Sequence, residues 1–229
     1  MIVTEFQRAR TQEQCNQRER EIRAAARRLL ARNAIEDISL RAVAAEAGLA
    51  PSNVLRHVGS REALLLDVMD EEYGAWLAEL GELVSVKLGG VDTRSMATMI
   101  ADTLTRRAVL QRLIEVSPQL LRKQSATPTR AQSREQGRRN GDGLADVVEA
   151  ALRARFSAVD RIYLVAGLHA VVSATAAWSQ QGVFAVSVPT AIRDLVQIQL
   201  DGLQARGTGG HDVGGTTRKP RRGSRTPRN

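Results

Sequence analysis

The segment from Ser39 to Arg61 gathers side chains that bind anions and side chains that form directional hydrogen bonds. Serine hydroxyls, guanidinium groups and the free backbone N–H groups at helix starts bind phosphate oxygens. Asparagine and arginine supply donors and acceptors that match base edges. The candidate contact residues of the segment are Ser39, Arg41, Pro51, Ser52, Asn53, Leu55, Arg56, His57, Ser60 and Arg61. Their chemistry is that of binding a polyanion, and it requires rigid supports at a defined spacing.

Two short helices are predicted to supply those supports. Ser39 caps a helix over Leu40 to Ala47, and Gly48 ends it because glycine adopts a left-handed backbone without steric penalty. Pro51 suits the first position of the next helix, which runs to His57. Helices of two turns are marginal by themselves, so both must pack on larger elements.

Longer helices are predicted on both sides of this pair. One runs from Asn16 to Arg32, after a polar N-terminal stretch that we expect to be mobile. The other follows its cap Ser60 and runs to about Val86, which is long enough to connect two domains. A supporting helix followed by helix, glycine-containing turn and helix is the helix-turn-helix arrangement, whose second short helix enters the major groove of DNA.

The second short helix is predicted to have a polar and an apolar side. Its expected outer face carries Ser52, Asn53 and Arg56. Its expected packing residues include Val54, Leu55 and Val58. Phosphates are expected at the starts of the first short helix and of the long helix, held by Ser39, Arg41, Ser60 and Arg61. His57 is expected to pack or to contact a phosphate, because no second His or Cys lies at metal-ligand spacing. A three-helix packing unit without a DNA role is the alternative.

The stretch IRAAARRLLARNAIEDISLRAVAAEAGLAPSNVLRHVGSREALL resembles the DNA-binding domain of the TetR family of bacterial transcription regulators, with a specific match across Ile22 to Leu64. The match rests on the Ala-Ala-Leu pattern of the first helix, on Ser39-Leu40-Arg41-x-Val43-Ala44, on Glu46-Ala47-Gly48, on His57, and on the basic-Glu-x-Leu start of the fourth helix. The resemblance implies an all-helical homodimer. Its N-terminal domains would bind a palindromic operator, and its divergent C-terminal domains would hold a small effector.

Four positions depart from the family pattern. Leu55 stands where a tyrosine is common, which removes a phosphate-binding hydroxyl, and Val58 stands where an aromatic residue is common. Ala50 replaces the usual serine cap, a loss of about 1 kcal/mol. Arg61 replaces a common lysine and keeps its charge. These changes bear on operator sequence and affinity and leave the motif intact.

The rest of the chain is also predicted to be helical. The expected helices are Thr93–Arg107, Val109–Val116, Thr127–Ala154, Val159–Gln180 and Pro189–Ala205. Pro118 is expected to stop the second of these, and Gly137, Gly141 and Gly143 to interrupt the third. The predicted organisation is an all-α chain in three parts: an N-terminal arm with the helix-turn-helix domain (1–60), a helical effector-binding and dimerisation domain (61–205), and a disordered basic tail (206–229).

Two sites are expected in the C-terminal domain. From the family layout, the effector pocket is assigned to Trp76, Met99 and His169. From the small and apolar residues of the last two helices, the dimer interface is assigned to Ala166, Ala170, Ala174, Leu195 and Gln199. Plain core packing is the alternative for both sets. Few charges lie on these helices, which favours a small and mainly apolar effector.

Composition narrows the remaining classes of function. Of the net charge of +8, the segment after residue 205 contributes seven basic residues and one aspartate, so the rest of the chain is nearly balanced. Cys15 is the only cysteine, which excludes an intramolecular disulfide and fits a reducing cytoplasm. No run of about 18 apolar residues is present, and Ile162 to Trp178 is expected to be a buried helix instead of a membrane span.

The sequence therefore predicts a cytoplasmic, sequence-specific DNA-binding regulator, most simply a repressor released by a small molecule, without cofactor or metal. We find no nucleophile–base pairing, metal-ligand spacing or phosphate-binding glycine loop that would predict an enzyme. Two alternatives stay open: a protein of this fold without an effector, and a nonspecific DNA-organising protein helped by its basic tail.

Overall fold

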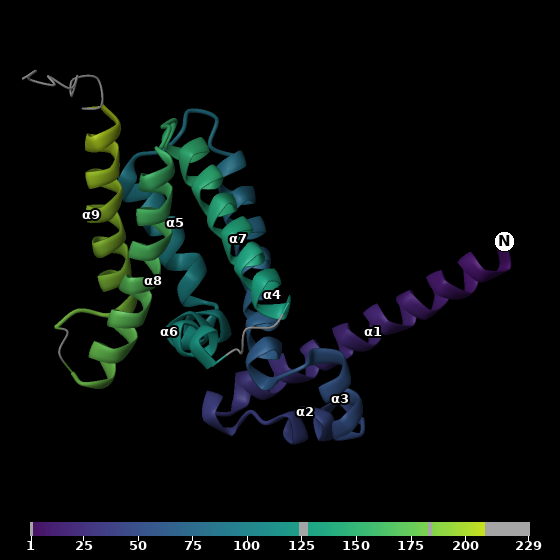
Figure 1. The fold of residues 1–229 in the computed structure, drawn as a ribbon. Coiled ribbons are helices and arrows are strands. Elements are labelled where there is room, and N and C mark those ends of the chain that lie inside the picture. The colour runs from purple at the N-terminus through teal and green to yellow at the C-terminus, as the bar shows by residue number, and fades with distance from the viewer. Residues whose placement is uncertain (1, 124–127, 183–184, 209–229) are drawn as a thin grey trace, which may run out of the picture.

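The computed structural model describes residues 2–123, 128–182 and 185–208, and every regular element in these ranges is helical (Figure 1). This confirms the predicted all-α fold. The elements are α1 (Ile2–Arg32), the short 3-10 helix η1 (Ile35–Asp37), α2 (Leu40–Ala47), α3 (Pro51–Val58), α4 (Arg61–Ser85), α5 (Thr93–Thr105), α6 (Ala108–Lys123), α7 (Pro128–Leu152), α8 (Ala158–Gln180) and α9 (Val188–Thr208). The helices predicted at α2 to α5, α8 and α9 agree within three residues at each end. Most of the predicted basic tail, from residue 209 on, lies outside the described residues.

The first helix is longer than predicted. It begins at Ile2 instead of Asn16, and its N-terminal half projects away from the other helices (Figure 1). The predicted start at Asn16 was wrong because the prediction relied on an apolar stripe. Straight-chain Glu, Gln and Arg residues have good helix propensity and can extend a helix from a packed base without such a stripe.

The C-terminal half of α1 packs with α2, α3 and the start of α4 into a small domain that we call the head. Ile22 and Leu30 of α1, Val43 of α2, and Val54 and Val58 of α3 are all buried. Burying each such side chain contributes roughly 1.5–3 kcal/mol. The two short helices therefore draw their stability from this shared core and not from their own length.

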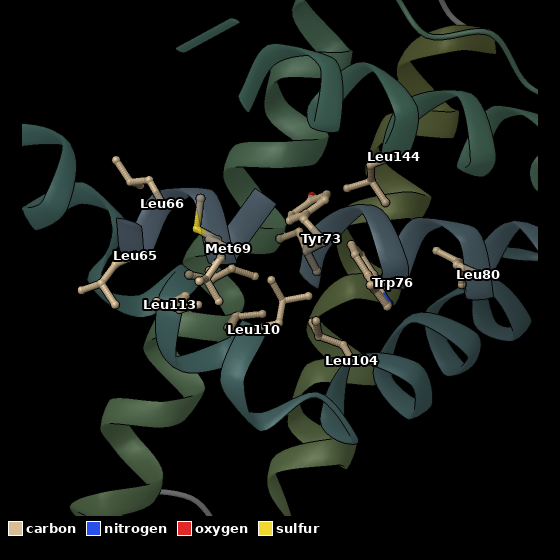
Figure 2. Packing of buried hydrophobic residues seen from close by; sticks show 14 of the residues in the cluster. Leu65, Leu66, Met69, Tyr73, Trp76, Leu80, Leu104, Leu110, Leu113 and Leu144 are labelled. Carbon is tan, nitrogen blue, oxygen red and sulfur yellow. The ribbon is translucent and has the colours of Figure 1, made fainter. Parts of the chain in front are cut away.

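The remaining helices form the body, and α4 runs from the head into it (Figure 1). Figure 2 shows Tyr73 and Trp76 of α4 between Leu144 of α7 and Leu104 of α5. The rings of Tyr73 and Trp76 meet edge to face with centroids 5.2 Å apart. The indole N–H of Trp76 donates to the hydroxyl of Thr103 at 2.9 Å, so this large side chain is buried without an unsatisfied donor.

The helix α6 continues through Pro118, where the sequence predicted its end. Proline lacks an N–H group and leaves the carbonyl four residues earlier without its helical partner. Here that carbonyl belongs to Ile114, and the hydroxyl of Ser117 donates to it at 2.9 Å. The neighbouring serine thus replaces the missing bond, and the prediction failed because it ignored this compensation.

The helix α7 is continuous, so the predicted interruption at its glycines was also wrong. Two of these glycines, Gly141 and Gly143, lie where neighbouring helices approach closely, whereas a Cβ atom at Gly137 would meet nothing within 4 Å. A Cβ atom at Gly143 would lie 3.0 Å from Leu77 of α4, and one at Gly141 would lie 3.2 Å from Val165 of α8. The lost helix propensity is therefore offset by closer packing between helices.

The helices α8 and α9 lie side by side at one edge of the body (Figure 1). The segment Ala158–Ser179 is long and apolar enough to cross a membrane by length and composition, with a mean hydropathy of 1.4, yet only 22% of it is buried in the chain. The expectation of a buried helix was therefore wrong for a single chain. Ile162 of α8 is 65% exposed and Ile198 of α9 is 68% exposed. An apolar surface of this kind indicates a contact with another molecule.

Candidate nucleic-acid interface

The ends of α2, α3 and α4 are fixed by specific local bonds. Ser39 accepts a bond from the backbone N–H of Ala42 at 3.1 Å, and Ser60 accepts one from Ala63 at 3.0 Å. Gly48 has φ 66°, which lets the backbone N–H of Leu49 donate to the Ala44 carbonyl at 2.9 Å. The turn between α2 and α3 is therefore a rigid connection. These bonds confirm the predicted boundaries of α2 and the predicted start of α4.

The outer side of α3 is open to solvent. Pro51, Ser52 and Arg56 are exposed, and Asn53 is half-buried. Leu55 is 51% exposed, so its predicted role as a packing residue was wrong. The reason is helical spacing: Val54 and Val58, four residues apart, fill the buried side, which leaves Leu55 turned outward. The exposed face of α3 thus combines polar groups with one apolar side chain.

The helices on either side of α3 each carry an arginine in their first turn. One of these side chains is exposed, and the other is bound to backbone carbonyls. Arg41, in the first turn of α2, is exposed at the surface. Arg61, in the first turn of α4, turns inward instead, and its guanidinium donates to the carbonyls of Ile35 and Ile38. Arg61 thus anchors the η1 segment, which differs from the expectation of a side chain free to bind phosphate.

A pair of arginines on α1 holds α2 in place. Arg28 and Arg32 contact the carboxylate of Glu46 at 2.7 and 2.9 Å. The hydrogen bond from Arg28, with the charge of Arg32, lowers the pKa of Glu46 below its ordinary value. All three side chains are solvent-accessible, so each pair stabilises the head only weakly. Their main effect is on the orientation of α2, and the sequence patterns alone did not indicate them.

His57 is half-buried and lies at the end of α3 against α1. Its Nδ1 atom is 3.6 Å from the Sγ atom of Cys15. This agrees with packing of His57 within the head. It also brings together two residues that lie 42 positions apart in the sequence, which no local pattern indicates.

This geometry is that of a helix-turn-helix head. Residues 22–68 match the sequence profile described as "Bacterial regulatory proteins, tetR family". Residues 22–68 therefore form a DNA-binding domain of the TetR family. The match indicates a DNA-binding transcription regulator, and α3 occupies the position of the second helix of the helix-turn-helix arrangement. A search of curated proteins found no match.

Solved structures show the same fold over most of the chain. The fatty acid degradation regulator FadR from Bacillus halodurans is 16% identical, with a TM-score of 0.55, over 82% of this chain and 96% of that one. Thermus thermophilus FadR in complex with lauroyl-CoA is 17% identical, with a TM-score of 0.56, over 81% and 94%. A Saccharomonospora viridis regulator in complex with choline is 18% identical, with a TM-score of 0.51, over 79% and 94%. At these identities the likeness establishes the fold alone.

The residues predicted for an effector pocket are partly brought together in the body. Trp76 is fully buried, Met99 is half-buried against the same core, and Tyr73 lies between Trp76 and His169. The rings of Tyr73 and His169 are 5.9 Å apart. Burial lowers the pKa of His169 and raises that of Tyr73. The assignment of these residues to a pocket stays a prediction.

Polar atoms in this interior lack partners within the described part of the chain. The Tyr73 hydroxyl and the Nε2 atom of His169 are both buried and form no hydrogen bond there. A hydrogen-bonded core histidine is the other interpretation of His169, and Nε2 makes no such bond within the described residues. Buried groups without partners cost about 1–3 kcal/mol each, so they are rare and call for an explanation.

The residues predicted for a dimer interface fall into two groups. Ala166 and Ala170 are exposed on α8, and Ala174 and Leu195 are half-buried. Gln199 has a role within the chain: its side-chain amide donates to the carbonyls of Tyr163 and Leu164, at 2.7 and 3.0 Å, over the space left by Gly167. Gln199 therefore joins α9 to α8, which the sequence reasoning missed.

Proposed function

We propose that this protein is a homodimeric repressor that binds a palindromic operator and leaves it when a small molecule occupies the body. The observation that carries the proposal is the exposed polar face of α3, held on a buried core by capped helix ends. Such a rigid rod with free donors and acceptors suits the major groove of DNA.

Specific contacts are assigned by exposure. Ser52, Asn53 and Arg56 face outward and are our candidates for base edges, with the Arg56 guanidinium matching a guanine. The outward Leu55 suits the methyl group of a thymine, which would replace the hydroxyl that other family members have there. Exposed Arg41 and the N-terminal backbone of α2 are assigned to phosphates.

A second copy is the proposed cover for the apolar surface of α8 and α9. Two helices from each chain would form a four-helix interface, and the exposed Ala166 and Ala170 would permit close approach. A bilayer is a poor cover, since α9 beside α8 exposes Asp194, Asp201 and Arg206. A symmetric dimer would present its two recognition helices to half-sites about one helical turn, or a multiple of it, apart.

An effector is proposed to bind beside Tyr73 and His169. The surroundings are mainly apolar, while the Tyr73 hydroxyl and the Nε2 atom of His169 are buried without a hydrogen-bond partner in the described part of the chain. This combination fits a small, mainly apolar molecule with at least one hydrogen-bonding group. The ligands named for related folds, lauroyl-CoA and choline, differ too much in chemistry to choose between classes.

The route from body to head is proposed to run through arginine contacts. Arg112 of α6 donates to the carbonyls of Asn33, at 3.0 Å, and Leu30, and so holds the C-terminal end of α1. Arg107, at the start of α6, contacts Glu79 of α4 at 2.7 Å. An effector that shifts α6 against α4 would thereby move the head. It can do so only by binding one arrangement better than the other.

The test is selection of bound sites from a random DNA pool at about physiological salt, roughly 0.15 M. An enriched inverted repeat is expected, and it would then serve as the probe for ligands that release the protein. Repression is checked with that repeat placed over a reporter promoter. Equal retention of random sequences by an intact dimer would contradict operator recognition, and a specific complex insensitive to every ligand tried would contradict the effector.

A further inference from the structure

Three metal-binding side chains meet between α1 and the end of the recognition helix. Cys15 and Glu19 lie one turn apart on α1, and His57 lies in the last turn of α3. The Sγ atom of Cys15 is 3.6 Å from Nδ1 of His57 and 3.8 Å from Oε1 of Glu19. One ligand atom from each residue falls within 4.8 Å of the other two. The DNA contacts assigned above to Ser52, Asn53, Leu55, Arg56 and Arg41 use none of these three side chains.

The spacing fits a tetrahedral transition-metal ion. Zinc binds sulfur at about 2.3 Å and nitrogen or oxygen at about 2.0–2.2 Å, so tetrahedral ligands lie about 3.5 Å apart. The two measured separations exceed this value by only a few tenths of an ångström. Small side-chain rotations, without movement of either helix, would bring the carboxylate to the same distance from the imidazole.

The surroundings support a cation in spite of nearby arginines. The second oxygen of Glu19 lies 3.7 Å from Nη1 of Arg23, which holds the carboxylate with Oε1 toward Cys15. Outer partners of this kind orient metal ligands. Arg20 and Arg56 line the same hollow, whose volume is about 900 Å³. A divalent ion with one thiolate and one carboxylate is neutral, so these guanidinium groups would not repel the occupied site.

We propose that Cys15, Glu19 and His57 bind one divalent thiophilic ion of the zinc class, with a solvent molecule from the open hollow as fourth ligand. A thiolate and an imidazole favour such ions over magnesium or calcium. On binding, the Cys15 thiol releases its proton to solvent, and Sγ forms the bond to the metal. The ion then links α1 to the recognition helix.

The linkage has a consequence for DNA binding that rests on the proposed function. Loss of the thiol proton and arrival of a doubly charged ion raise the local charge by one, beside the exposed Arg56. The ion also fixes the end of α3 against α1. Both effects favour the DNA complex, so the metal-loaded protein should bind its operator more tightly.

Cobalt(II) titration of the full-length reduced protein tests the site directly. Cys15 is the only cysteine, so a thiolate-to-cobalt absorption band reports this site alone, and zinc should abolish the band by displacement. We expect one ion per chain. Loss of an outer partner already costs about 10–100-fold in affinity, so His57→Gln and Glu19→Gln should each weaken binding at least about tenfold. Cys15→Ser should remove the band.

Gln14→Ala is the matched control, because Gln14 lines the same hollow but is no metal ligand, and its titration should equal the wild-type one. Absence of a band in folded protein would overturn the site. A band that survives unchanged in His57→Gln and Glu19→Gln would also overturn it, since the thiol would then be bridging two chains.

Operator affinity with zinc and with a chelator tests the linkage. We expect zinc to tighten binding at least about fivefold, the lower range of coupling between linked sites, and Cys15→Ser to remove this response. A cobalt band with zinc-independent operator affinity would overturn the linkage but not the site. A cobalt band without any selected operator would instead contradict the proposed function.

Discussion

The head and the body of this molecule differ in how completely each one covers its apolar side chains and pairs its polar groups within one chain. In the head, capped helix ends and a buried core leave only the outer face of α3 and its flanks for another molecule. The body exposes apolar side chains along α8 and α9, and it buries the Tyr73 hydroxyl without a hydrogen-bond partner among the described residues. The head therefore presents one defined binding surface. The body has apolar surface and a buried polar group that the proposed second copy and the proposed ligand would cover.

The largest expected effect comes from disturbing the apolar surface of the body. Ile162→Glu would place a charge in the proposed dimer interface, where it could not be hydrated. We expect monomers by sedimentation. Joining two half-site binders raises overall affinity by about 10²–10⁴-fold, so operator affinity should fall by a similar factor although the head is untouched.

Leu88→Glu is the matched control for this change. Leu88 is 91% exposed, more than Ile162, but it lies in the connection between α4 and α5 and belongs to neither helix of the apolar surface. The variant should remain dimeric with unchanged affinity. If Ile162→Glu also stayed dimeric, the apolar surface of α8 would need another explanation.

The next effect in size concerns the head alone. Arg56→Ala should cost about 1–3 kcal/mol of operator binding and relax the preference at particular base pairs, because a guanidinium that contacts a base edge would be lost. The measurement is binding to the selected repeat and to its single-base variants. Arg94→Ala on α5 removes an exposed charge far from α3 and should change neither affinity nor preference. A uniform loss over all sequences would instead assign Arg56 to a phosphate.

The contrast between the regions also explains what the sequence was able to predict. In the head, local rules decide the structure: Ser39 and Ser60 cap helices, Gly48 ends one, and Pro51 starts one. The predicted boundaries of these helices are therefore close to the observed ones. The position of Leu55 was missed because a helix of two turns has too few residues for its apolar pattern to fix which side is buried.

Features that depend on contacts between distant segments were not predictable from the sequence. Gly141 and Gly143 of α7 serve close approach to α8 and α4, where local rules predicted breaks. The inward turn of Arg61 and the meeting of Cys15 with His57 depend on the packed fold of the head. In each case the tertiary partner, and not the local propensity, determined the outcome.

A smaller effect is expected at the junction between the two regions, where acids lie on α4. The pKa of Asp70 is raised to about 7, mainly by burial and also by the charge of Asp67, while the hydrogen bond from Asn140 acts to lower it. Burial likewise raises the pKa of Asp67 to about 6. Both acids ordinarily titrate near 3.8. The folded state therefore holds protons that the unfolded state releases, and stability falls as the pH rises from about 4 to about 7.

Asp70→Asn should remove most of this dependence and stabilise the protein at pH 8 by about 1–2 kcal/mol, a value discounted for partial solvent screening. The new amide oxygen can still accept the bond that Asn140 donates at 3.0 Å. Urea unfolding at a series of pH values measures the difference. Asp102→Asn, at an exposed position of α5, should leave the profile unchanged, and equal behaviour of the two variants would contradict a buried acid at Asp70.

The smallest expected effects test whether the head unfolds with the body or before it. Ser39→Ala removes the cap of α2 and should lower the free energy of unfolding by about 1 kcal/mol. Ala50→Ser adds a hydroxyl at the N-cap of α3, where the ψ of 140° already suits a capping residue, and should raise the free energy of unfolding by up to about 1 kcal/mol. Arg112, Arg107 and the shared helix α4 join the two regions, so we expect one unfolding transition that shifts in opposite directions for the two variants. Far-ultraviolet dichroism in urea follows all helices, and Trp76 fluorescence follows the body core, with Trp178 as a second emitter on α8. If the variants moved the dichroism but left the fluorescence transition in place, the head would be an independent folding unit, and any signal from an effector would have to reach it through local contacts alone.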